Sequence, residues 1–82
     1  MIARYKIKLD TIDKVKRFVS IVDKFDNDVD IVSGRYLVNA KSILALFSLE
    51  LTESLDLIIH DVNISDVEKI KDVMEEFKID EL

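Results

Sequence analysis

The sequence contains no cysteine, no proline, no tryptophan and only one glycine among its 82 residues. The lack of cysteine excludes disulfides, zinc–thiolate sites and a thiol nucleophile, and it fits a reducing compartment. The lack of proline and of glycine-rich stretches excludes flexible linkers and low-complexity segments, so residues 1–82 are predicted to form one domain. A chain of this length is near the size at which a single hydrophobic core is only marginally sufficient.

Long apolar runs and a strongly basic face are also missing. No apolar stretch approaches the about 18 residues that a membrane-spanning helix needs, and residues 1–4 do not begin a signal peptide. The formal net charge is −5, which disfavours nucleic-acid binding because neutralising phosphates requires a basic surface. We therefore expect a cytoplasmic protein that binds neither membranes nor nucleic acid.

The apolar periodicity at the start of the chain predicts a strand followed by a helix. Residues 3–9 alternate between apolar and mainly basic side chains, which is typical of a strand with one face on a core. From residue 12 the apolar positions recur every three or four residues, as on one stripe of a helix: Ile12, Val15, Phe18, Val19, Val22 and Phe25. Asp10 or Thr11 is the expected N-cap of this helix.

The middle of the chain predicts a β-hairpin and a short helix. Residues 26–28 favour a turn, and two β-rich runs, 29–32 and 35–39, flank Ser33 and Gly34. Because glycine adopts positive φ without steric cost, we expect the tight turn at Gly34. The short helix begins at Ser42 and has too many apolar residues for one narrow stripe, so some of them are expected to be exposed.

The last part of the chain predicts a fourth strand and a third helix. Residues 55–60 alternate as a strand, and residues 61–63 turn the chain. Ser65 and Glu68 have the spacing of a capping box, within an apolar stripe formed by Ile64, Val67, Ile70, Val73, Met74 and Phe77. Residues 78–82 are expected to fray. The order β-α-β-β-α-β-α predicts an α+β, open-faced β-sandwich, with three helices covering one face of a four-stranded, mainly antiparallel sheet.

This order of elements, together with two short segments, resembles the HPr family. These are the small phosphocarrier proteins of the bacterial phosphoenolpyruvate-dependent sugar phosphotransferase system. The first segment is KFDNDV at residues 24–29, and the second, more specific one is VNAKSI at residues 38–43, which continues to FSL at residues 47–49. The resemblance covers nearly the whole chain and implies a single HPr-like domain over residues 1–82.

The residues that carry the family's phosphate are replaced in this chain. HPr proteins carry phosphate on a histidine just before the first helix, in a motif like H-A-R-P, beside an arginine that steadies the phosphate. Aligned without gaps through residues 24–29, the histidine position falls on Thr11, the arginine position on Asp13 and the proline position on Lys14. Threonine cannot form a phosphoimidazole and aspartate repels phosphate, so the resemblance implies a divergent member that is not an enzyme and has no catalytic residue. His60, the only histidine, is predicted to be a surface residue at a strand end.

A second feature of the family is retained at Ser42. In Gram-positive HPr proteins the serine of the K-S-I segment is phosphorylated by an ATP-dependent kinase, and the modified protein binds a transcriptional regulator of catabolite repression. Ser42 matches this serine, and Ile43, Leu44 and Phe47 fall where the family's docking patch lies. The chain departs from the family at two positions usually held by glycine, which here are Ala45 and Glu50.

We therefore predict a non-catalytic regulatory or partner-binding protein that acts through Ser42 and the adjacent apolar patch. The implied partners are phosphotransferase-system enzymes, a serine kinase or a transcriptional regulator, and the protein itself is expected to be a monomer or a weak homodimer. Two alternatives stay open: a phosphocarrier that uses an unusual residue, and a structural module that pairs with itself. Ser42 also fits an ordinary N-cap of a helix that covers a sheet.

No cofactor and no metal are predicted. Asp26, Asp28 and Asp30 alternate as metal ligands can, but the glycine and the terminal glutamate of an EF-hand loop are absent at the required places. A solvated turn and strand edge explain these three residues.

Overall fold

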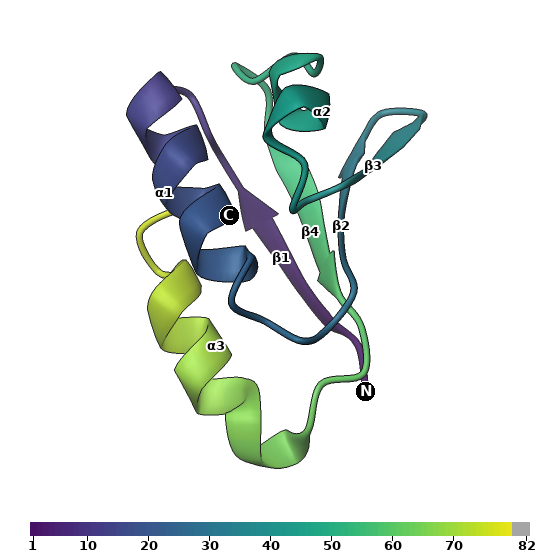
Figure 1. The fold of residues 1–82 in the computed structure, drawn as a ribbon, viewed down its shortest axis with the longest axis vertical. Coiled ribbons are helices and arrows are strands. Elements are labelled where there is room, and N and C mark those ends of the chain that lie inside the picture. Colours follow the sequence, from purple (N-terminus) through teal and green to yellow (C-terminus); the bar gives the residue numbers. More distant parts are fainter. Residues whose placement is uncertain (80–82) are drawn as a thin grey trace.

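The computed structural model describes residues 1–79, which form a four-stranded antiparallel sheet and three α-helices (Figure 1). The strands are β1 (Ala3–Ile7), β2 (Val29–Ser33), β3 (Tyr36–Asn39) and β4 (Leu55–Ile59), in the spatial order β1-β4-β2-β3. The helices are α1 (Ile12–Val22), α2 (Ile43–Phe47) and α3 (Val67–Met74), and a 3-10 turn, η1 (Ile64–Asp66), precedes α3. The predicted α+β, open-faced sandwich is confirmed.

One face of the sheet shares a single core with the inner sides of the helices. On this face Leu57 of the inner strand β4 lies opposite Tyr5 of β1 and Ile31 of β2. The buried side chains from the helices are Val15, Phe18 and Val22 of α1, Leu46 of α2, and Ile70 and Met74 of α3. Phe18 also packs edge-on against Phe77 with ring centroids 5.4 Å apart, which joins α1 to the segment after α3.

The turns of the sheet are fixed by two residues with positive φ. Gly34 has φ 59° between β2 and β3, where Ser33 lies opposite Tyr36, so the predicted hairpin turn is confirmed. Asp61, just after β4, has φ 54°, a conformation that the sequence pattern does not indicate. The side-chain amide of Asn27 holds this second turn by donating to the carbonyl oxygens of His60 (2.8 Å) and Asp61 (3.1 Å).

The predicted start of the third helix is wrong. Ser65 lies inside the 3-10 turn η1, and neither Asn63 nor Asp66, the residues before η1 and α3, makes a side-chain capping bond. Because the 3-10 turn precedes the α-helix, Ile64 lies outside the regular 3.6-residue repeat and is 82% exposed rather than part of the buried stripe.

The predicted fraying of the C-terminal segment is wrong for Lys78 and Ile79. Lys78 forms an antiparallel bridge with Ile7 at the end of β1, and the Ile79 N–H donates to the carbonyl of Lys6 (3.1 Å). The Lys8 N–H donates in turn to the carbonyl of Phe77 (2.9 Å). This short segment therefore lies along the outer edge of β1, whereas residues 80–82 lie outside the described residues.

Candidate functional site

The candidate residues lie at two helix starts that use the same capping chemistry. Thr11 precedes α1 and Ser42 precedes α2, and both have extended backbone conformations (φ −132°, ψ 153° and φ −97°, ψ 104°). The Thr11 Oγ1 accepts a hydrogen bond from the N–H of Lys14 at 3.0 Å, and the Ser42 Oγ accepts one from the N–H of Ala45 at 3.3 Å. Both helix starts agree with the sequence prediction, with Thr11 rather than Asp10 as the first cap.

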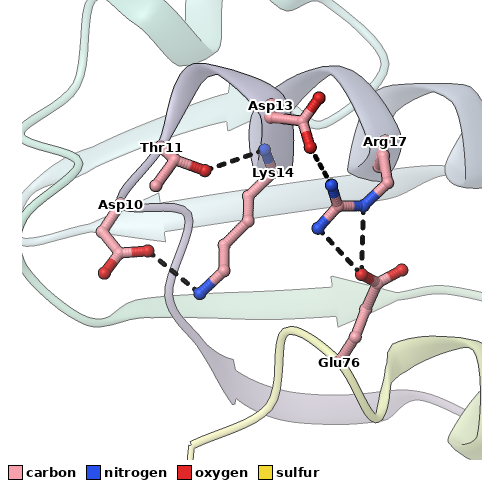
Figure 2. A network of polar contacts seen from close by, with 6 residues as sticks. All are labelled: Asp10, Thr11, Asp13, Lys14, Arg17 and Glu76. Atoms are coloured by element: carbon pink, nitrogen blue, oxygen red, sulfur yellow. Dashed lines mark hydrogen bonds and ion pairs between the residues drawn. The ribbon is translucent and has the colours of Figure 1, made fainter.

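The start of α1 is surrounded by ion pairs (Figure 2). The Nζ of Lys14 lies 3.0 Å from Asp10 Oδ1. Arg17 pairs with Asp13 one turn earlier, and its Nε and Nη2 both lie 3.1 Å from Glu76 Oε2. The hydrogen bond from Lys14 lowers the pKa of the Asp10 carboxyl, so this side chain stays charged further into the acid range.

These contacts decide what the start of α1 can do chemically. The positions that the family resemblance assigns to the histidine and the arginine are a helix cap, Thr11, and an acceptor for Arg17, Asp13. In this network Lys14 and Arg17 are each already paired with a carboxylate, so neither cation is free to hold an incoming phosphate as the family's arginine does. Through the contact between Arg17 and Glu76, this network connects α1 to the segment after α3. Glu76 was not anticipated, because no local pattern links it to residues of α1.

The start of α2 has different surroundings. Its first turn contains no acidic residue, and Ser42 is half-buried. The preceding turn is fixed by Asn39, whose Oδ1 accepts from the Lys41 N–H (2.9 Å) and whose carbonyl accepts from the Ser42 N–H (3.1 Å). The Nζ of Lys41 donates to the carbonyl of Phe25 (2.6 Å), which connects this turn to the loop that follows α1. The Ser42 hydroxyl therefore stands on a well-held backbone with no carboxylate in the turn that it caps.

Of the predicted docking residues, two are exposed to solvent and one packs against the core. Leu44 is 80% exposed and Phe47 is 43% exposed, whereas Ile43 is half-buried and packs against the core. Ile12, which the sequence pattern assigned to the buried stripe of the first helix, is 65% exposed in the first turn of α1. We call Ser42, Leu44 and Phe47 the α2 patch.

His60 directly follows β4. It is partly exposed, and its Nε2 lies 2.9 Å from Asp30 Oδ2. The position at a strand end was predicted, but the pairing with Asp30 was not, because it depends on β2 and β4 being neighbours. Within residues 1–79, no group of three or more His, Cys, Asp or Glu side chains could hold a metal ion.

No helix in the described part of the chain combines the length and the apolar character needed to cross a membrane.

Comparison with known proteins identifies the fold. The chain is similar to the crystal structure of HPr-C-His from Thermoanaerobacter tengcongensis, with a TM-score of 0.67 and 22% sequence identity, over 94% of this chain and 90% of that chain. No family model and no curated protein matches the sequence. The structural likeness shows that the chain has an HPr-like fold.

Proposed function

We propose that this HPr-like protein is related to the sugar phosphotransferase system and works as a non-catalytic regulator or partner-binding protein through the α2 patch. The observation that carries the proposal is the contrast between the two helix starts. Acidic side chains occupy the start of α1, whereas the start of α2 pairs a serine cap with exposed Leu44 and Phe47. The K-S-I match at residues 41–43 supports the same assignment.

Phosphorylation of Ser42 is the proposed switch. A phosphoryl group adds about −1.5 to −2 charges, which the N-terminus of a helix tolerates because its free N–H groups point at the anion. No carboxylate in the first turn of α2 opposes this charge. The phosphate would stand beside Leu44 and Phe47 and change which surface can dock there. The partners that fit are a serine kinase, a transcriptional regulator and phosphotransferase enzymes of the bacterial cytoplasm; no cofactor is required.

The test is intact mass with site mapping after two parallel incubations. One contains ATP and an HPr serine kinase, and the other contains phosphoenolpyruvate and the first enzyme of the phosphotransferase system. We expect one phosphate on Ser42 in the first incubation and none in the second. Ser42→Ala should abolish the modification, whereas Ser48→Ala, at the other end of α2, should leave it unchanged.

Three outcomes would contradict this proposal. A phosphate on Thr11 or His60 after the second incubation would establish carrier chemistry at an unusual residue. An unmodified Ser42 in the first incubation would remove the switch. A Ser42→Asp variant that binds every candidate partner as the parent does would remove the role of its charge.

A further inference from the structure

One edge of the sheet, β1, is covered by another segment of the chain, whereas the other edge, β3, is open in the described part of the chain. The β1 edge is covered by the chain's own C-terminal segment, through the bridge between Ile7 and Lys78 and the bond from the Ile79 N–H to Lys6. The other edge is β3, and within residues 1–79 no strand or bridge lies on its outer side. Figure 1 shows β3 at the margin of the sheet, on the side away from α1 and α3. A strand edge left this way presents unpaired backbone groups to other chains.

The hydrogen-bond pattern between β2 and β3 shows which backbone groups of β3 point outward, away from β2. The Ala40 N–H donates to the carbonyl of Val29 (2.9 Å), so residues 36, 38 and 40 direct their backbone groups toward β2. Leu37 lies between them, opposite Val32, and directs its N–H and its carbonyl outward. Leu37 is thus the centre of the open edge.

The side chains of β3 do not protect this edge. Tyr36 and Leu37 are 65% and 64% exposed. The strand YLVN contains no charged residue and no proline, which are the usual means of blocking edge pairing. Its protection is limited to its length of four residues.

We propose that β3 pairs antiparallel with β3 of a second copy of this chain, with Leu37 opposite Leu37 on the two-fold axis. In this register Tyr36 of each copy lies opposite Val38 of the other, an aromatic–β-branched pair of the kind that stabilises neighbouring strands. The Leu37 side chains of the two copies pack together on the sheet face that no described helix covers. The N–H and carbonyl of each Leu37 form two hydrogen bonds with those of the other Leu37. The strand is therefore complementary to itself, which favours a second copy over an unrelated extended peptide.

The charges around this register are also compatible with pairing. Arg35 lies in the hairpin turn just before β3, outside the strand, so no charged residue of β3 faces another within the paired register. The two copies of Arg35 lie beyond opposite ends of the antiparallel strands, so they do not repel each other across the pair. Because β3 is short, the contact is smaller than that of a stable dimer, and the dimer is expected to be weak and concentration-dependent. The pairing is independent of the α2 patch and of its proposed function.

The first experiment is sedimentation equilibrium over concentrations from about 10 μM to about 1 mM, the range in which weak association is visible. We expect a reversible monomer–dimer equilibrium for the parent chain. Leu37→Lys should abolish the dimer, because it places two ammonium groups opposite each other on the axis. The matched control is Leu44→Lys, which makes the same exchange at an exposed leucine of α2 and should leave the dimer unchanged.

The second experiment tests the register itself and uses the absence of native cysteine. Residues facing each other in a hydrogen-bonded antiparallel pair have Cα atoms about 5.5 Å apart, within disulfide reach. Leu37→Cys should therefore cross-link into a disulfide dimer under mild oxidation. Tyr36→Cys is equally exposed but lies opposite Val38 in the dimer, so it should cross-link weakly. A parent chain that stays monomeric, a dimer broken by Leu44→Lys instead of Leu37→Lys, or equal cross-linking at both positions would overturn the proposal.

Discussion

The starts of α1 and α2 are both capped by a hydroxyl group, but their surroundings differ. A hydroxyl accepts a backbone N–H in each, yet Asp10, Asp13 and Glu76 surround the first, whereas the second has no acidic residue in its opening turn. The capping residue by itself therefore does not define a site for an anion or a partner. The charges and exposed side chains around the cap decide whether the helix start can receive a ligand.

The largest expected difference between the two helices is in how firmly each is anchored. Phe18 of α1 is fully buried against Phe77, so Phe18→Ala should lower the free energy of unfolding by about 3–5 kcal/mol. Phe47 of α2 is partly exposed, and Phe47→Ala should cost well under half as much. Urea denaturation of both variants measures this directly. Equal losses would show that α2 is held as tightly as α1.

Removing each cap tests whether the two hydroxyls contribute equally. Thr11→Ala should lower the free energy of unfolding by about 1 kcal/mol, because it leaves an N–H of α1 without its acceptor. Ser42→Ala should cost less, since its bond is longer (3.3 Å) and α2 has only five residues. Thermal unfolding of the two variants would resolve the order. A larger loss at Ser42 would make that residue chiefly a structural cap.

The ion pairs at the start of α1 should make a smaller, salt-dependent contribution to the free energy of unfolding. Arg17→Gln removes the contacts with Asp13 and Glu76 and should cost about 0.5–1 kcal/mol at low salt, and less at about 1 M salt, because these groups are partly exposed. Lys16→Gln, on the same helix, is a control with no ion pair among the described residues. A loss at Arg17 that salt does not reduce would show that packing rather than charge is responsible.

The smallest effect is on the ionisation of Asp10. Its pKa lies below the ordinary 3.8 because the carboxylate accepts a hydrogen bond from Lys14. The stabilising contact is therefore present at neutral pH and is lost as the pH falls through the lowered pKa. Lys14→Gln should raise the pKa of Asp10, as followed by NMR of the carboxyl carbon. Glu50, whose pKa is lowered by its bond with the Thr52 hydroxyl, should not move in this variant.

The sequence predicted most of this fold because its elements depend on local signals. Alternation in β1 and β4, the glycine at position 34, and the caps at Thr11 and Ser42 each act within a few residues. Local spacing also predicted a capping box at Ser65. This prediction is wrong because a 3-10 turn precedes α3.

The surroundings of the candidate site could not be predicted in the same way. The contact of Arg17 with Glu76 joins α1 to the segment after α3, and the contact of His60 with Asp30 requires β4 to lie beside β2. Neither pair has a spacing that a sequence pattern could show. The exposure of Leu44 and Phe47 was anticipated only as a surplus of apolar residues in a short helix, because the identity of the buried positions depends on how α2 packs against α1 and β3.

The position of β1 also bears on how the protein is made. β1 precedes β2, β3 and β4 in the chain, yet its partners are β4 and Lys78, which are synthesised later. The hairpin of β2 and β3 can form during synthesis because its strands are adjacent in sequence. β1 cannot pair until β4 has been synthesised. The sheet is therefore complete only when β4 and Lys78 are available to pair with β1.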